Sequence, residues 1–210
     1  GPAGGVMGAL SEGKANNYNN LITVDIGGTS CDIALVNDAK PLIRQEGFID
    51  KYMVRVPMVD VNAIGSGGGS IAWLDKAGGL KVGPHSAGSE PGPVCYDRGG
   101  AEPTVTDASV VLGLIDPDFF AGGRFKLNVD KAYNAISENI AKPLSLTVEE
   151  SALGIHKVLN AQMAEGIRFV SIKQGFDPRD FVLMGLGGGG PLHACELANE
   201  LSIRKVLVPI

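Results

Sequence analysis

The feature that most constrains the fold of this chain is residues 21–36, with the sequence LITVDIGGTSCDIALV. Two apolar segments, residues 21–26 and 33–36, are rich in the β-branched residues that suit a buried sheet. Between them, Gly27 and Gly28 permit a tight turn, because glycine takes backbone angles that other residues avoid. The stretch therefore predicts a strand, a tight turn and a second strand.

The same turn is a predicted anion-binding site. Its backbone N–H groups and the hydroxyls of Thr29 and Ser30 point into one concavity, an arrangement that binds phosphate. The Asp25 carboxylate stands at the end of an apolar strand, where burial without a partner costs free energy. A metal ion held on a phosphate, directly or through water, is one such partner. The alternative is a structural turn in which Asp25 caps backbone donors, and the hairpin alone favours neither.

Composition excludes several classes of protein. The 210 residues are 44% apolar, enough for one large domain or two small ones. No apolar run approaches the roughly 20 residues of a membrane span, and the first residues lack the pattern of a signal peptide. The 18 Lys and Arg residues are scattered and the net charge is −5, which argues against nucleic-acid binding. Three widely spaced cysteines without a CxxC pair are typical of a reducing cytoplasm. We therefore expect a cytoplasmic protein that binds neither nucleic acid nor membrane.

The longest predicted helix covers residues 147–173. It begins at Thr147, where Glu150 three residues later completes a capping box. His156 lies one position off the apolar stripe of this helix, so we expect it at the surface or at a boundary. The expected buried stripe consists of Ala152, Ile155, Leu159, Met163, Ile167 and Val170.

Other elements follow from shorter patterns. The first helix is expected over residues 1–15, with Val6, Met7 and Leu10 on one face. The Gly- and Pro-rich residues 77–106 predict an ordered loop region. The remaining expected elements are helices over 106–114, capped by Thr106 or Asp107, and over 130–141, and strands over 41–48, 52–62, 71–74, 181–186 and 205–210.

A second glycine-rich segment follows the strand predicted at 181–186. Pro191 suits an early helical position, so the pattern is strand, glycine turn and helix N-terminus, which offers N–H groups and a positive dipole end to a ligand. No lysine follows the glycines, so this is not a P-loop. His193 either faces this pocket or caps a neighbouring carbonyl. The glycines that let a base or ribose lie against the backbone are Gly187, Gly188, Gly189 and Gly190. The two glycine segments suggest two ends of one nucleotide.

Five segments, in order and spacing, resemble the hydantoinase A / 5-oxoprolinase / acetone carboxylase family over nearly the whole chain. They are GPAGGVMGA, DIGGTSCDIALV, VNAIGSGGGSIAWLD, SAGSEPGPVCYDRGGAEPTVTDA and GFDPRDFVLMGLGGGGPLHA. Cys31 and Gly189 depart from the commoner Thr and Ala, and both replacements are small. The resemblance implies an α/β fold: a ribonuclease-H-like half of an actin, sugar-kinase or heat-shock type ATPase, with a mixed sheet flanked by helices and inserted Gly/Pro-rich loops.

The resemblance also implies a domain organisation. Residues 1–210 are expected to form a single hydantoinase A-type domain, the second half of an ATP clamp, with residues 50–145 partly an inserted substrate-side region. The chain opens within a motif and without an initiator Met, so the first half of the clamp is expected upstream of Gly1. We expect the isolated 210 residues to be inactive, and a hydantoinase B-type partner subunit is implied.

The implied activity is ATP-dependent hydrolysis of a cyclic amide, such as hydantoin, N-methylhydantoin or 5-oxoproline. Phosphorylation of the lactam carbonyl oxygen makes it a leaving group, so water can open the ring. Asp25 is expected to anchor Mg²⁺, and Asp32 to orient a hydroxyl or water; the alternative for Asp32 is an exposed strand-end charge paired with Lys or Arg. The terminal phosphates are assigned to Gly27, Gly28, Thr29 and Ser30, and the adenosine to the loop at 185–190.

Two other functions remain open from the sequence. One is a non-catalytic, nucleotide-binding assembly subunit, and the other is a subunit of an ATP-dependent ketone carboxylase. A sugar or acid kinase shares both glycine segments but has no need of the long stretch EPGPVCYDRGGAEPTVTD. The segments that either border the substrate or form structural turns are residues 65–70 and the group Cys95, Tyr96, Thr104, Thr106 and Asp107.

Overall fold

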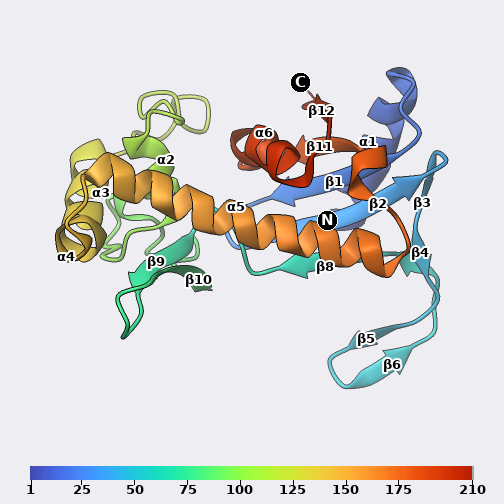
Figure 1. Ribbon diagram of the computed structural model, residues 1–210, viewed down its shortest axis with the longest axis horizontal. Helices are drawn as coiled ribbons and strands as arrows, with labels where there is room; N and C mark the ends of the chain where they lie inside the picture. Colours follow the sequence, from blue (N-terminus) through green and yellow to red (C-terminus); the bar gives the residue numbers. More distant parts are fainter. Residues whose placement is uncertain (210) are drawn as a thin grey trace. The chain divides into compact units, whose positions relative to one another are not determined.

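A computed structural model of the chain describes residues 1–209, with the backbone alone for residues 48 and 49 (Figure 1). It divides the chain into two compact units. Unit 1 consists of Gly1–Ile26, Cys31–Ile64 and Ala164–Ile210, and unit 2 consists of Gly27–Ser30 and Gly65–Met163. No helix among residues 1–209 is long and apolar enough to cross a membrane.

Unit 1 is built on a mixed six-stranded sheet. Its central strand β1 (Leu21–Ile26) pairs antiparallel with β2 (Cys31–Asn37) and parallel with β11 (Val182–Leu186). The outer strands are β12 (Val206–Leu207), parallel to β11, and β3 (Lys40–Pro41) and β8 (Val61–Ile64), both antiparallel to β2. Both glycine segments therefore follow strands of one sheet, β1 and β11. This strand order is the ribonuclease-H-like arrangement that the resemblance implied.

One face of this sheet is covered by α1 (Pro2–Ala15). Val6, Ala9 and Leu10 are buried against residues of β1, β2 and β11, including Leu21. The sequence placed Met7 on the same face, and this was wrong: Met7 is 50% exposed. Each helical residue advances by about 100°, so Met7 lies beside the stripe that Val6, Ala9 and Leu10 form.

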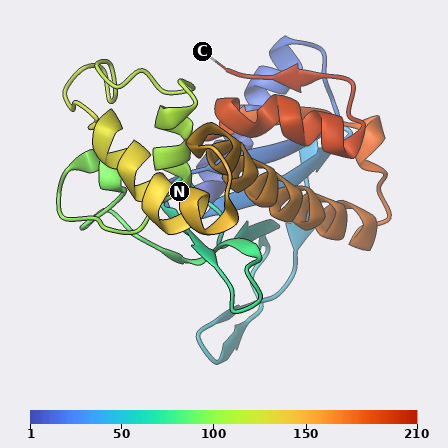
Figure 2. The same cartoon turned by 60° about the vertical axis from the view of Figure 1, so that its left-hand side comes forward.

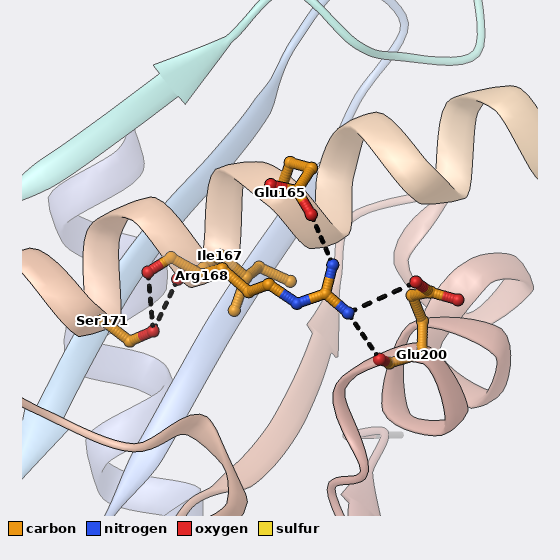
Figure 3. Close-up of polar contacts among 5 residues, drawn as sticks. All are labelled: Glu165, Ile167, Arg168, Ser171 and Glu200. Atoms are coloured by element: carbon orange, nitrogen blue, oxygen red, sulfur yellow. Dashed lines mark hydrogen bonds and ion pairs between the residues drawn. The ribbon is translucent and has the colours of Figure 1, made fainter.

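The other face is covered by α6 (Gly190–Leu201) and the unit 1 part of α5 (Val148–Lys173). Gly166 of α5 packs closely on this face, because a Cβ there would lie only 3.1 Å from Ile33 Cδ1. Arg168 of α5 donates to the backbone carbonyl of Glu200 on α6 at 2.7 Å (Figure 3). The predicted stripe of α5 is buried throughout, and the Thr147–Glu150 capping box is formed.

The strands predicted over 41–48 and 52–62 are each broken. Pro57 interrupts the second segment, because a proline has no N–H to donate to a strand ladder. In the first segment, the chain leaves the edge of β2 after Pro41 and pairs with residues 58–59 instead. The resulting short strands are β3, β4 (Ile43–Arg44), β5 (Gly47–Ile49), β6 (Tyr52–Val54), β7 (Met58–Val59) and β8. β4 pairs with β7, and β5 pairs with β6.

Unit 2 contains a hairpin and a group of short helices, among which α2 and α3 lie side by side (Figures 1 and 2). Its elements are β9 (Ser70–Leu74), β10 (Leu80–Ser86), η1 (Val94–Tyr96), α2 (Val105–Val111), α3 (Val129–Ile136), the π-helical turn η2 (Ser137–Ala141), α4 (Lys142–Leu144) and the first part of α5. Cys95, Val110, Leu127 and Ala132 form a buried cluster.

Two predictions for unit 2 need correction. The strand β10 was missed, because Gly83 and Pro84 within it are typical of a loop. The N-cap of α2 is Thr104 rather than Thr106 or Asp107, and Asp107 is instead the third helical residue that completes the capping box. The pattern Thr-x-x-Asp carried this signal in the sequence.

Candidate functional site

The turn Gly27–Ser30 is held in place by the three consecutive glycines at residues 67–69, which also belong to unit 2. Gly68 N donates to Gly27 O at 3.0 Å, and Gly69 N donates to Gly28 O at 2.6 Å. A Cβ on Gly67 would lie 2.8 Å from both Gly27 O and Thr29 N, so a side chain there is excluded. The sequence did not identify residues 67–69 as a support for the turn, although three consecutive glycines between apolar strands were a signal of close backbone contact.

The turn itself presents N–H groups that the protein does not use. Gly27 N donates to Ser30 O at 3.0 Å, which closes the turn. Within residues 1–209, the N–H groups of Gly28, Thr29 and Ser30 donate to no other group. Consecutive N–H groups of this kind form a nest for an oxyanion. The residues present therefore fit a phosphate group.

Asp25 lies in unit 1 at the carboxyl end of β1 and is half-buried. Two glycines from different elements leave room around its carboxylate. A Cβ on Gly5 of α1 would lie 3.3 Å from Asp25 Oδ2, and a Cβ on Gly187 would collide with Asp25 Oδ1 and lie 2.6 Å from Ile26 O. Within the described chain no N–H group donates to Asp25, so the backbone-capping alternative has no donor here.

Asp32 stands directly opposite Asp25 in the antiparallel pair of β1 and β2. Burial, and then the charge of Asp25, raise the pKa of Asp32. Burial, Asp32 and Asp25 together raise the pKa of the neighbouring Cys31 thiol to about 12. Like charges directly opposite each other destabilise a strand pair. Neither carboxylate forms an ion pair with a Lys or Arg in the part of the chain that the structure describes, so a cation from outside the chain is favoured here.

The carboxylates of Asp25 and Asp32 suit one kind of metal ion. The described residues contain no group of three or more His, Cys, Asp or Glu side chains that would enclose a metal ion. Mg²⁺ differs from zinc in that it keeps several waters and is commonly held by one or two carboxylates together with phosphate oxygens. The pair Asp25 and Asp32 therefore fits Mg²⁺ that arrives with a phosphate.

The loop after β11 packs closely against β1 within unit 1. Gly189 N donates to Ile26 O at 2.9 Å, and a Cβ on Gly189 would lie 2.7 Å from Ile26 Cγ2. Gly187 has a φ of +71°, a conformation that favours glycine, while Gly188 faces open space. The helix α6 begins at Gly190, and Pro191 lies in its first turn, as predicted. His193, which the sequence placed near a pocket or a carbonyl, is 1% exposed.

Asp107 is the centre of a buried hydrogen-bond network in unit 2. The residue is fully buried, and its carboxylate accepts from Val94 N at 3.1 Å and Cys95 N at 2.7 Å. It also accepts from Thr104 N at 2.8 Å and Thr104 Oγ1 at 2.7 Å. Burial and the charge of Asp107 raise the pKa of the Cys95 thiol. For Cys95, Thr104 and Asp107 the structural alternative is therefore correct, because all three are enclosed and the first two donate hydrogen bonds to Asp107.

His156 was predicted at the surface or at a boundary, and this was wrong, because it is buried. It is 5% exposed, and its Nε2 lies 3.0 Å from Ser109 Oγ on α2. Burial lowers the pKa of His156 from 6.5 to about 4. The apolar stripe of α5 shows only which face is most apolar; it does not show that α2 covers the adjacent face as well.

The sheet order and the two strand-borne glycine segments define an α/β protein with a ribonuclease-H-like unit. Residues 1–210 match the family described as hydantoinase/oxoprolinase, and the chain belongs to this family.

Named relatives include both amide-cleaving and carboxylating enzymes. The chain is 46% identical to caprolactamase subunit alpha of Pseudomonas jessenii, over 100% of this chain and 30% of that protein. It is 48% identical to the acetophenone carboxylase gamma subunit of Aromatoleum aromaticum, over 100% of this chain and 29% of that protein. A crystal structure of the ATP-dependent caprolactamase from Pseudomonas jessenii matches with a TM-score of 0.87 and 45% identity, over 99% of this chain and 29% of that one. The chain thus spans less than a third of the length of these relatives.

Proposed function

We propose that this chain binds Mg-ATP for an ATP-dependent enzyme that opens a cyclic amide. The observation that carries the proposal is the set of unused N–H groups at Gly28, Thr29 and Ser30, in a turn that residues 67–69 hold in place. Together with Gly27, these residues are assigned to the terminal phosphates. Asp25 is assigned to Mg²⁺, and Asp32 to the orientation of a water or hydroxyl.

The loop after β11 is assigned to the adenosine. Gly187, Gly188, Gly189 and Gly190 carry no side chains, so a flat base or ribose can approach the backbone. The close contacts of this loop with Ile26 fix its position within unit 1. The N-terminus of α6 adds a positive dipole end beside the loop.

The assigned chemistry is phosphorylation of a lactam carbonyl oxygen, which converts a stable amide into a group that water can open. Such transfer depends on positioning and charge neutralisation more than on covalent catalysis. The turn positions anionic oxygens, Asp25 holds the cation, and Asp32 orients the attacking water or hydroxyl. The similarity to an ATP-dependent caprolactamase supports a cyclic amide as the substrate class.

We assign residues 1–210 to one hydantoinase A-type domain, the second half of an ATP clamp, with residues 50–145 partly a substrate-side insertion. The short coverage of the relatives supports a larger protein. The first half of the clamp, from the same protein, and a hydantoinase B-type subunit are the proposed partners, and the isolated chain is expected to be inactive.

A second candidate is a subunit of an ATP-dependent ketone carboxylase. The specific observation in its favour is the 48% sequence identity to an acetophenone carboxylase subunit. This value is as high as the 46% identity to the caprolactamase subunit, so identity does not favour the amide-cleaving relative. Both candidates use the same nucleotide site and differ only in the acceptor of the phosphoryl group.

The test is ADP release by the full-length protein with its partner subunit. The panel contains hydantoin, N-methylhydantoin, 5-oxoproline and caprolactam, and acetone and acetophenone with bicarbonate. We expect a lactam to stimulate ADP release and to be opened in proportion to it. Stimulation by a ketone with bicarbonate would select the carboxylase instead. Nucleotide binding without turnover on any substrate would identify a non-catalytic subunit, and absence of nucleotide binding would refute the proposal.

A further inference from the structure

The long loop EPGPVCYDRGGAEPTVTD, residues 90–107, has no role in the nucleotide assignments above. The side chains of Thr104 and Asp107 in this loop form hydrogen bonds within the buried network around Asp107. That network ties η1 to the first turn of α2, so the position of the next polar residue, Thr106, is fixed from both sides.

Thr106 connects this network to the turn Gly27–Ser30, called the phosphate turn below. Its Oγ1 and its backbone N both donate to Gly68 O at 2.8 Å. On the other side of the same residue, Gly68 N donates to Gly27 O at 3.0 Å. Gly68 is therefore bonded to α2 through its carbonyl oxygen and to the turn through its N–H group, and all of these residues lie in unit 2.

The space around Gly68 shows that the Thr106 hydroxyl has a defined place. A Cβ on Gly68 would lie 2.8 Å from Thr106 Oγ1, so the hydroxyl occupies the position that a side chain would need. On the next residue, a Cβ on Gly69 would lie 2.8 Å from Gly28 O and 2.9 Å from Ser86 Oγ. Residues 67–69 are thus confined on both sides, and a shift of α2 moves them against the turn.

We propose that Thr106 is a positioning residue: it sets the phosphate turn through Gly68 and makes the nucleotide step sensitive to the loop at 90–107. This inference rests on the proposed nucleotide binding by the turn. Thr106 acts through Gly68 and Gly27 and is assigned no contact with nucleotide or substrate.

The experiment compares Thr106→Val, which keeps the shape and removes the hydroxyl, with Thr106→Ser, which keeps the hydroxyl. Ser151→Ala is the matched control, because Ser151 is also buried in unit 2 and its Oγ also donates to a backbone carbonyl, that of Thr147 at 2.9 Å. Amide hydrogen exchange at Gly68 and Gly69 is measured by NMR in the 210-residue chain without nucleotide. Separately, kcat and KM for Mg-ATP are measured in the full-length protein.

We expect Thr106→Val to speed exchange at Gly68 and Gly69 about tenfold, as the loss of one hydrogen bond implies. We expect kcat for ATP hydrolysis to fall about tenfold, because a displaced turn loses alignment with the phosphates. Thr106→Ser and Ser151→Ala should change neither by more than about twofold. If Thr106→Val does not fold, Thr106→Cys, with a weaker donor in the same place, carries the same expectation with a smaller change.

Unchanged exchange in Thr106→Val would overturn the proposal, and so would faster exchange with unchanged kinetics. An equal loss of kcat in Ser151→Ala would show a general effect on stability and would also overturn it. A full-length protein that does not bind ATP would refute the proposed function alone, because the exchange measurement needs no nucleotide.

Discussion

The regions around Asp25 and Asp107 place the same side chain in opposite situations. Asp107 is fully buried and accepts four hydrogen bonds from the chain itself. Asp25 is half-buried, accepts none within residues 1–209, and faces a second carboxylate at Asp32. A carboxylate that the protein satisfies holds the fold together, whereas one that it leaves unsatisfied, in space cleared by glycines, is available to a ligand.

The glycines also fall into an enclosed set and an open set. Gly67 and Gly69 are enclosed by backbone atoms, and a Cβ on either would lie 2.8 Å from a backbone oxygen. Gly28 and Gly188 face open space. The enclosed glycines serve packing, and the open ones lie where a ligand can approach the backbone. This contrast leads to predictions that separate structural from functional residues.

The largest effect on stability is expected from Asp107→Asn. An amide keeps one acceptor oxygen but turns an NH₂ group toward donors, which leaves buried N–H groups unpaired. We expect a loss of about 3 kcal/mol in the free energy of unfolding, measured by urea denaturation. The control is the exposed Asp130→Asn, which removes only a favourable charge in the first turn of α3 and should cost less than about 1 kcal/mol. A loss below about 0.5 kcal/mol would show that the network contributes little.

A comparable loss of stability is expected at acidic pH, through the protonation of His156, which contacts Ser109 of α2. Its pKa is about 4 in the folded chain and 6.5 in the unfolded chain. Between pH 6.5 and 4 only the unfolded chain takes up the proton, so the free energy of unfolding decreases as the pH is lowered. The dependence vanishes above 6.5 and levels off below 4. From pH 7 to 4 the loss through this group is about 3 kcal/mol.

The check is urea denaturation of the wild type and of His156→Gln at several pH values. Carboxylates titrate equally in both proteins, so the difference between them isolates His156. We expect the free energy of unfolding of the wild type to decrease relative to that of His156→Gln as the pH falls from 6.5 to 4. A difference that does not change with pH would contradict the assignment.

The smallest effect on stability is expected from Asp25→Asn. The substitution removes repulsion from Asp32 and breaks no hydrogen bond to the chain, so stability should change by no more than about 0.5 kcal/mol. ATP turnover by the full-length protein should nevertheless fall by at least about 100-fold, because a cation ligand is lost. A loss of stability as large as that of Asp107→Asn would make Asp25 a structural residue and remove the contrast.

Much of the fold around the candidate site could be predicted from the sequence because its signals are local. The apolar strands around Gly27, the capping box at Thr147 and the glycine turn before Pro191 each report their own structure. The corrections have two causes. The burial of His156 and the support of the turn by residues 67–69 depend on contacts between distant segments, and no local period reveals which segment covers which. The Thr104 cap is a local signal, the Thr-x-x-Asp capping box, that the prediction placed at Thr106 or Asp107 instead. Short strands interrupted by proline or glycine were missed for the related reason that tertiary pairing outweighed local preference.

The central claim is that the turn Gly27–Ser30 binds the phosphates of ATP, and an NMR titration of the 210-residue chain tests it most directly. Backbone amide signals are followed during addition of Mg-ATP, with Mg²⁺ alone and Mg²⁺ with adenosine as controls. We predict saturable shifts at Gly28, Thr29 and Ser30 with Mg-ATP only, and a dissociation constant on the order of 1 mM, since one half of a clamp binds weakly. Shifts confined to other residues, or no shift at these three amides at 10-fold that concentration, would contradict the account.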